Sequence, residues 1–385
     1  MKRKQLLTLF ACNLVGWMFV QPAMNLLPVY AVRLGADQSW AGNILALAFF
    51  GLLIGTLLTG ILSAVFQRRR LMLFVAGAVN VPAVFLMGRA GDHIELALLT
   101  AVVFCCVGVS FTTVSILTGL FASESQRGRI FGILAVNNGL GALIGGAVSG
   151  PIADASGFPA LFAVGAVWWI LQPLVALLME DRRIQPQPRE SSGALPAVSG
   201  LGAPFYLFLL GTTMGLAATF FAVLGRPLVM DELKFDSTAI SGAGAIAGAF
   251  SLPFPFIIGW LSDRVGRFWL IVSCFLVGAA GLVALAFAVQ LWHFWLASIL
   301  LAAIGVSIGV GSAFMTDLVP AEKIGWALTL FGFAGPVGGI AGFLFTGNAI
   351  RSLGAPQTFL GGALLTLLAI TLMIVARPTR LQPAE

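Results

Sequence analysis

Charged residues are scarce in this chain. Of its 385 residues, 21 are Lys or Arg and 15 are Asp or Glu, which together make 9% of the sequence, whereas soluble domains carry about 25%. Hydrophobic residues make up 59%, so the polar residues are too few to cover a folded globule in water. The composition excludes an ordinary soluble protein and indicates a protein whose solvent is the lipid bilayer.

Groups that usually perform catalysis or bind metals are scarce as well. The chain has two histidines and four cysteines, and the cysteines fall inside apolar stretches without the spacing of metal ligands. No phosphate-binding loop is present, and no basic patch is interleaved with aromatic residues as in nucleic-acid-binding proteins. We therefore expect no enzyme activity, no catalytic residues, no metal, no cofactor and no nucleic-acid partner.

Apolar stretches fill most of the chain. A membrane-spanning helix needs roughly 20 apolar residues, and the sequence holds twelve such stretches. They cover residues 8–31, 39–63, 71–90, 95–121, 128–151, 157–179, 204–228, 238–260, 268–290, 294–316, 325–347 and 356–376. The stretches lack strict alternation and so predict helices, not the strands of a membrane barrel. The expected fold is an all-α polytopic membrane protein with twelve transmembrane helices.

The Lys and Arg residues are unevenly divided between the two sides of such a bundle. With the N-terminus inside, 16 of them lie on the inner side and 5, among them Arg226, on the outer side. The positive-inside rule then places both termini in the cytoplasm and the protein in the cell (inner) membrane. The sequence pI near 9.6 reflects this topology.

The second half of the chain repeats the first. Residues of the same type coincide when the chain is shifted against itself by 199 or 197 positions. The pairs include Pro28 with Pro227, Asp37 with Asp236, Gly60 with Gly259, Gly145 with Gly342 and Pro159 with Pro356. We expect two pseudo-symmetric six-helix bundles, residues 1–179 and 204–385, joined by a cytoplasmic linker at 180–203 rich in Pro, Ser and charged residues. Two parallel six-helix repeats are typical of transporters that rock one half against the other.

One charged segment carries a specific signal. In "GWLSDRVGRFWL", residues 259–270 follow the pattern G-x-L-x-D-R-x-G-R, with Asp263, Arg264, Gly266 and Arg267 at its charged and glycine positions. The first-half copy departs from it, with Ala64 at the acidic position and Gln67 at the glycine. A second pattern of glycines, Gly132, Gly141, Gly145 and Gly150, follows in the fifth stretch. In these residues the chain resembles the major facilitator superfamily, and most of all its twelve-helix efflux branch of drug and solute antiporters.

The resemblance implies a gate. In that family the loop carboxylate contacts the first turn of a helix in the opposite half, so Asp263 should lie near Arg127. An anion there is favoured because the first N–H groups of a helix are unpaired and partly positive. Gly141 and Gly145 should form a tight seam between the helices at 128–151 and 238–260. The plainer alternatives are that the charges only fix topology and that the glycines only pack.

Polar residues in the first stretch predict a substrate site. Asn13, Trp17, Gln21 and Asn25 are spaced by four and so cover one broad face of a helix. A polar stripe within lipid is unfavourable unless it faces water or partners, so it either lines a cavity or bonds neighbouring helices. If the resemblance holds, the cavity is completed by residues from other stretches, namely Thr113, Asn138, Thr212, Phe220 and Ser307.

No ionisable residue falls in the middle of a predicted span, which favours a neutral or amphipathic solute over a strongly charged one. The leading interpretation is a monomeric secondary transporter that exports a small organic solute by alternating access, with protons as a candidate coupling ion. Uptake or facilitated exchange of a sugar-like solute is the alternative within transport. A degenerate receptor or assembly protein that moves nothing is the alternative outside it.

The topology can be tested by cysteine labelling in a variant without native cysteines. Single cysteines at Arg69, Ser192 and Arg264 should be protected from impermeant thiol reagents in intact cells, because these positions are expected inside. Cysteines at Asp92, Asp231 and Arg351 should react. Labelling at position 192 from outside the cell would reverse the orientation.

Overall fold

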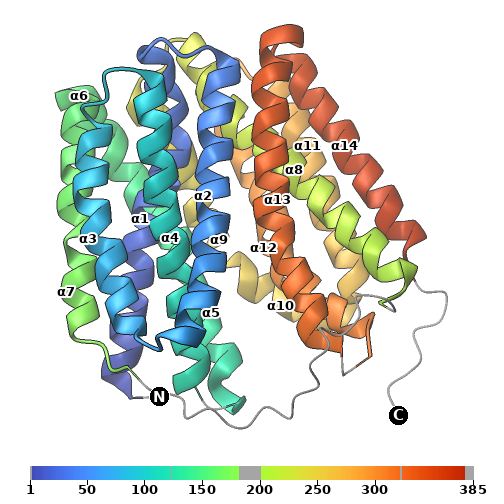
Figure 1. Ribbon diagram of the computed structural model, residues 1–385. Coiled ribbons are helices and arrows are strands. Elements are labelled where there is room, and N and C mark those ends of the chain that lie inside the picture. Colours follow the sequence, from blue (N-terminus) through green and yellow to red (C-terminus); the bar gives the residue numbers. More distant parts are fainter. Residues whose placement is uncertain (1, 123, 182–200, 321–322, 378–385) are drawn as a thin grey trace.

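The computed structural model describes residues 2–122, 124–181, 201–320 and 323–377, and within these ranges all regular secondary structure is helical (Figure 1). The elements are α1 Arg3–Arg33, α2 Gln38–Val65, α3 Arg69–Met87, α4 His93–Phe121, α5 Glu124–Leu140, the π-helical turn η1 Gly141–Gly145, α6 Gly146–Trp169, α7 Leu171–Leu177, α8 Gly202–Glu232, α9 Ser237–Ser251, α10 Phe254–Val265, α11 Arg267–Ala286, α12 Leu291–Asp317, α13 Ile324–Leu353 and α14 Ala355–Val375. The predicted all-α fold is confirmed.

Twelve passes across the bundle arise from these elements. Length and composition single out 10 helical segments of the described chain that could span a membrane. One of them, Arg129–Leu177, is 49 residues long and turns back at Gly157, where φ is 79°. A further pass consists of α9 and α10, which are separated at Leu252 and Pro253 and are too short to count singly. The described helices thus fit the twelve passes predicted from hydropathy.

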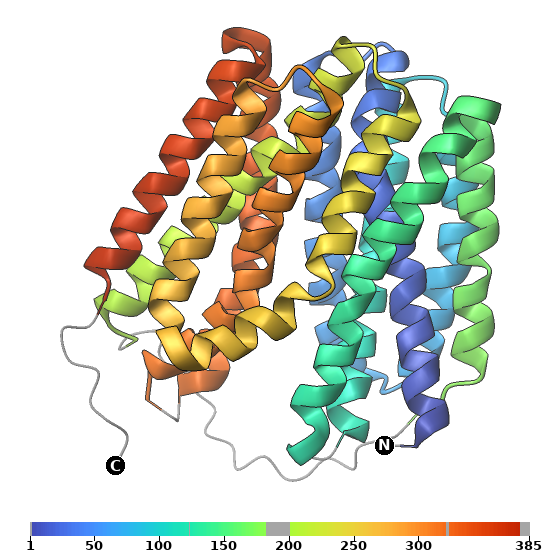
Figure 2. The same ribbon diagram turned by 180° about the vertical axis from the view of Figure 1, so that it is seen from behind.

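The helices form two groups that lie side by side (Figures 1 and 2). The first group consists of α1 to α7 and the second of α8 to α14. They contact each other mainly through α2 with α13, and through η1 and α6 with α9. At the end of the bundle where α1 begins the groups diverge, and at the end where α1 stops they meet (Figure 2). We call these the open end and the closed end.

A carboxylate of the first group holds a helix of the second group at the closed end. Asp154 in α6 accepts hydrogen bonds from the backbone N–H groups of Ser237 and Thr238, at 2.9 and 2.8 Å, and from the Thr238 hydroxyl at 2.6 Å. These N–H groups open α9, where they have no partner inside the helix. The N-cap residue Asp236 also accepts a bond, from the Ala239 N–H at 2.7 Å. The start of α9 therefore binds one carboxylate from each group.

The equivalent place in the repeat carries the opposite charge. Arg351 in α13 lies 2.7 Å from the carboxylate of Asp37, which is the N-cap of α2. The internal shift of 197 places Arg351 opposite Asp154, and the shift of 199 places Asp37 opposite Asp236. The closed end is thus held by two pseudo-symmetric contacts, one through a cation on an N-cap carboxylate and one through a carboxylate on helix N–H groups.

Glycines bring α6 and α9 close together below this contact. A Cβ atom on Gly146 would collide with the backbone of Ser241, and one on Gly150 with the backbone of Ser237. Gly141 and Gly145 instead face α1, so the close approach to α9 that was predicted for them is made by other residues. Successive residues of a helix point about 100° apart, so Gly145 and its neighbour Gly146 face different helices.

The structure also describes the backbone of the charged segment that carries the family resemblance, and two of its cations. Gly266 joins α10 to α11 with φ at 89°, and Gln67 at the equivalent place of the first half has φ at 49°. Arg267 pairs with Asp317 of α12 at 2.9 Å, and Arg264 lies 4.0 Å above the Trp260 ring. Both cations therefore contact their own group.

The structure describes only part of the predicted gate. The side chains of Asp263, Arg127 and Ala64 fall outside the described part of the chain, so the contact between Asp263 and the start of α5 stays a prediction. In Figure 2, α10 turns away from α5 at the open end, and it packs against α11 and α12. The predicted linker at 180–203 lies mostly outside the described residues as well.

Removing the Asp154 carboxylate should loosen the closed end. A lost helix cap is worth about 0.5–2 kcal/mol, so Asp154→Ala should raise the population with the closed end open by about 2- to 30-fold. Double electron–electron resonance between spin labels at Leu86 and Leu353 would show longer distances. Asp92→Ala removes the cap of α4, whose carboxylate bonds only its own helix, and should leave the distances unchanged. Identical distributions in both variants and the wild type would refute this role for Asp154.

Candidate substrate site

The polar stripe of α1 begins with a residue that joins two helices. The Asn13 side chain is buried and donates from Nδ2 to the Leu134 carbonyl of α5 at 3.1 Å. Asn137 of α5 donates in return to the Phe10 carbonyl at 3.0 Å. These two bonds tie α1 to α5 within the first group, so Asn13 lies in an interhelical contact and not on an open surface.

Two residues of the predicted site meet on an exposed surface. Gln21 of α1 donates from Nε2 to Oδ1 of Asn138 in α5 at 2.6 Å, and the pair is accessible to solvent. Both lie where the two groups face each other, because the next residue, Gly139, contacts Leu252 at the break between α9 and α10. An exposed pair of amides on an otherwise apolar surface can donate and accept hydrogen bonds to one polar group of a solute.

Next to this pair, the stripe reaches a buried arginine. Asn25 donates from Nδ2 to the Gln21 carbonyl at 2.9 Å, and its Oδ1 accepts from Nη2 of Arg226 in α8. Arg226 also donates from Nη1 to the Ser298 hydroxyl of α12 at 2.6 Å. Only 9% of Arg226 is exposed. A line of hydrogen bonds therefore runs from the exposed amides into the contact between the two groups.

Sequence reasoning misplaced Arg226. It was assigned to the outer end of the stretch 204–228, among the outer charges, because Asp231 and Glu232 follow. In the structure α8 continues to Glu232, and Arg226 is buried within this helix, which its place near the end of the stretch did not indicate. The signal was present, since the flanking residues 227–230 are Pro, Leu, Val and Met.

The remaining predicted residues are occupied by contacts within the protein. Trp17 stacks on Phe111 of α4 with 4.7 Å between ring centroids. Phe220 lies 5.0 Å from Phe49 of α2 and 4.9 Å from Phe343 of α13, so it joins an aromatic cluster that spans both groups. Ser307, which is buried, bonds its own helix at the Ile304 carbonyl.

The last two predicted hydroxyl residues are hidden. Thr113 and Thr212 are buried, and their Oγ1 atoms find no hydrogen-bond partner among the described residues. Together with Ser307, they do not form a surface that a solute could touch in this conformation. Of the predicted site, Asn138 is exposed, and its partner Gln21 is half-buried, as are Trp17 and Phe220.

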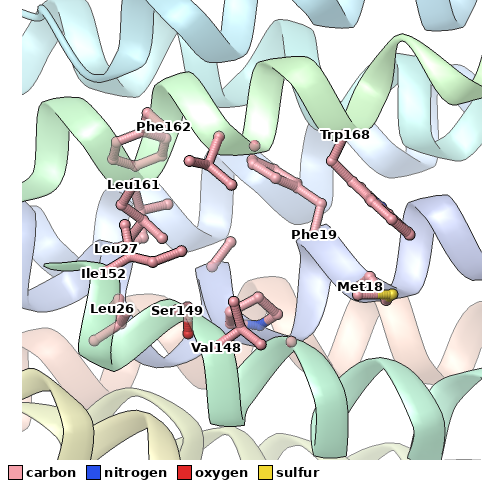
Figure 3. A pocket seen from close by; sticks show the side chains of 15 residues that line it. Met18, Phe19, Leu26, Leu27, Val148, Ser149, Ile152, Leu161, Phe162 and Trp168 are labelled. Carbon is pink, nitrogen blue, oxygen red and sulfur yellow. The ribbon is translucent and has the colours of Figure 1, made fainter.

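A separate apolar cavity of about 260 Å³ lies inside the first group (Figure 3). It is bounded by α1, η1 and both arms of α6, and the rings of Phe19, Phe162 and Trp168 face it. The remaining lining residues are Met18, Pro22, Ala23, Leu26, Leu27, Gly145, Val148, Ser149, Ile152, Leu161, Val164 and Gly165. None of the polar residues of the predicted site belongs to it.

The described residues offer no set of metal ligands, because no three His, Cys, Asp or Glu side chains among them come together. The exposed pair has no nucleophile or general base within bonding distance. Its chemistry is reversible hydrogen bonding, which suits the recognition of a solute.

Two proteins with similar sequences are named for multidrug resistance. The chain is 25% identical over 317 residues to the multidrug resistance protein MdtG of Enterobacter lignolyticus (strain SCF1), covering 78% of this chain and 74% of that one. The MdtG of Serratia proteamaculans (strain 568) is 26% identical over the same length, with 78% and 76% covered.

Solved structures share the fold at low sequence identity. A crystal structure of the nucleoside transporter NupG superposes with a TM-score of 0.77 at 13% identity, covering 97% of this chain and 98% of that one. A bacterial homologue of the human lysosomal transporter Spinster, in an inward-facing and unoccupied conformation, gives 0.72 at 15% identity, with 98% and 96% covered.

The family described as Major Facilitator Superfamily matches residues 6–224 and, a second time, residues 207–385. The two matches together extend over nearly the whole sequence and reflect its internal repeat. On this ground, and with two six-pass groups in the structure, the chain belongs to the Major Facilitator Superfamily of transporters.

Proposed function

We propose that this secondary transporter exports a small amphipathic organic solute from the cytoplasm by alternating access. The observation that carries the proposal is the hydrogen-bonded pair of Gln21 and Asn138, in a bundle whose two groups of helices meet at one end and diverge at the other. A solute that enters from the open end meets these amides first. Rocking of the groups would then open the closed end and release it.

The direction of transport rests on two supports. The excess of Lys and Arg at the open end favours the cytoplasm for that end, and we therefore interpret the structure as an inward-facing state. The similar MdtG proteins are named for multidrug resistance, which favours export of solutes with apolar bodies. The aromatic cluster of Phe49, Phe220 and Phe343 adds apolar surface between the two groups.

Coupling and assembly complete the proposal. We expect the chain to act as a monomer, since both groups that must rock lie in one chain. Protons are the proposed coupling ion, and flux measured with and without a pH gradient tests this directly. Uptake of a sugar-like solute is the second candidate, because paired amides also suit hydroxyl groups, and the same flux assay decides between the directions.

Substitutions in the exposed pair should weaken transport without unfolding the protein. Each amide is expected to contribute one net hydrogen bond of about 0.5–1.5 kcal/mol to solute binding. Gln21→Ala and Asn138→Ala should therefore each raise the KM for transport of the fluorescent amphiphile N-phenyl-1-naphthylamine by about 2- to 13-fold. Uptake into inverted membrane vesicles and thermal unfolding of the purified protein are the two measurements.

Asn13→Ala is the matched control. It removes an amide from the same helix face, but one that bonds the Leu134 carbonyl in a buried contact. This variant should lower the unfolding temperature and leave the KM of the folded fraction near the wild-type value. If Gln21→Ala and Asn138→Ala lose thermal stability while their KM stays unchanged, the pair is a structural contact and the proposed site is wrong.

A further inference from the structure

Arg226 is a buried cation without a buried anion. Its side chain reaches the Ser298 hydroxyl and the Asn25 amide oxygen, and its Nε atom has no hydrogen-bond partner in the part of the chain that the structure describes. Among the described residues it makes no ion pair. The carboxylates that follow on the same helix are engaged elsewhere, Asp231 with Arg33 and Glu232 with Gln38.

Neutral partners compensate a buried guanidinium only in part. Removing a charge from water is unfavourable by several kcal/mol, and hydrogen bonds with good geometry are needed to offset it. A planar guanidinium presents five N–H donors arranged to fit the two oxygens of an acid group. The Ser298 hydroxyl and the Asn25 amide oxygen accept from two of these donors but do not offer the paired oxygens of an acid group.

The two partners of Arg226 come from different groups of helices. Ser298 belongs to α12, in the same group as Arg226, whereas Asn25 belongs to α1. When the closed end opens, α1 must move away from α8, so Arg226 keeps Ser298 and loses the Asn25 oxygen. In that state Nη1 still donates to Ser298, but Nη2 has lost the Asn25 oxygen as its acceptor. The guanidinium then faces the space between the two groups of helices.

The position that Asn25 vacates is next to the proposed solute site. Asn25 lies four residues, or about one helical turn of 5.4 Å, from Gln21, whose carbonyl it contacts. A solute held by Gln21 and Asn138 can therefore extend an acid group to Arg226 during the same transition. This geometry contradicts the neutral cavity that the sequence suggested.

We propose that Arg226 binds an oxyanion group of the transported solute, such as a carboxylate or sulfonate, and that the Asn25 side chain occupies this position while the end is closed. The inference rests on the proposed function, which it narrows to amphipathic solutes with one acid group. Asn25 and the solute compete for the same donors. Loss of the solute therefore allows the closed end to form again.

Binding of a matched pair of probes tests the proposal. Naphthalene-1-sulfonate and naphthalene-1-sulfonamide share one ring system and differ in charge. The purified protein in lipid nanodiscs should bind the sulfonate more tightly, as measured by tryptophan fluorescence and by the shift in unfolding temperature. Arg226→Gln should weaken sulfonate binding by about 10-fold or more, since a charge-assisted hydrogen bond is lost, and change sulfonamide binding less than about 2-fold. Arg226→Lys should restore part of the sulfonate affinity.

Two further variants keep the test decisive if Arg226→Gln folds poorly. Asn25→Asp supplies a carboxylate to Arg226, so it should raise the unfolding temperature and abolish the preference for the sulfonate. Arg89→Gln removes an exposed cation at the same end and should change neither probe. Equal binding of both probes by the wild type, or a preference that persists in folded Arg226→Gln and Asn25→Asp, overturns the proposal.

The outcomes also separate this inference from the proposed function. Flux of both probes into inverted vesicles should accompany binding. Transport of the sulfonamide with no selectivity for the sulfonate would leave export of amphipathic solutes standing and refute the role of Arg226. Selective sulfonate binding without flux of either probe would support the anion site and refute export.

Discussion

The contact between Asp154 and the first N–H groups of α9 joins the two groups of helices at the closed end. A helix that begins at a membrane surface has unpaired donors, and here a carboxylate from the other group satisfies two of them. The glycines at 146 and 150 let α6 approach α9 closely enough for that carboxylate to arrive. With these helices in contact, α1 lies against α8, and Asn25 can reach Arg226. The contact of Asp154 with α9, the close packing of α6 on α9 and the hydrogen bonds from Gln21 to Arg226 thus belong to one arrangement of the two groups.

Hydropathy was sufficient to predict the passes, the internal repeat suggested the two groups of helices, and the polar residues of the first stretch suggested the proposed site. Gln21 and Asn138 were found because an amide in an apolar helix is unfavourable unless it has a partner or faces water. Asn13 has its partner inside the bundle, the Leu134 carbonyl. Sequence periodicity cannot distinguish an amide that bonds a neighbouring helix from one that a solute can reach. The difference depends on which helix lies opposite, which only the tertiary arrangement shows.

The residues that were missed share a cause. Asp154 and Arg226 stand near the ends of apolar stretches, where a sequence gives no means of telling a loop charge from a buried or bridging one. The π-helical turn at Gly141–Gly145 was not predicted either, and the close contact with α9 is made by Gly146 and Gly150. The eroded first copy of the charged motif keeps its backbone shape, since Gln67 adopts a positive φ like Gly266. The turn geometry was therefore retained where the side-chain chemistry was not.

A cation placed where Arg226 lies makes the empty carrier sensitive to the membrane potential. In the proposed orientation, with the open end toward the cytoplasm, this charge would lie on the inner side of the closed contacts, and it would come under the outer potential once those contacts open. A full elementary charge moved across 100 mV corresponds to about 2.3 kcal/mol. A negative cell interior should therefore favour the arrangement seen here while the site is empty. A bound oxyanion would cancel the charge, so the loaded carrier would reorient with little opposition from the electric field.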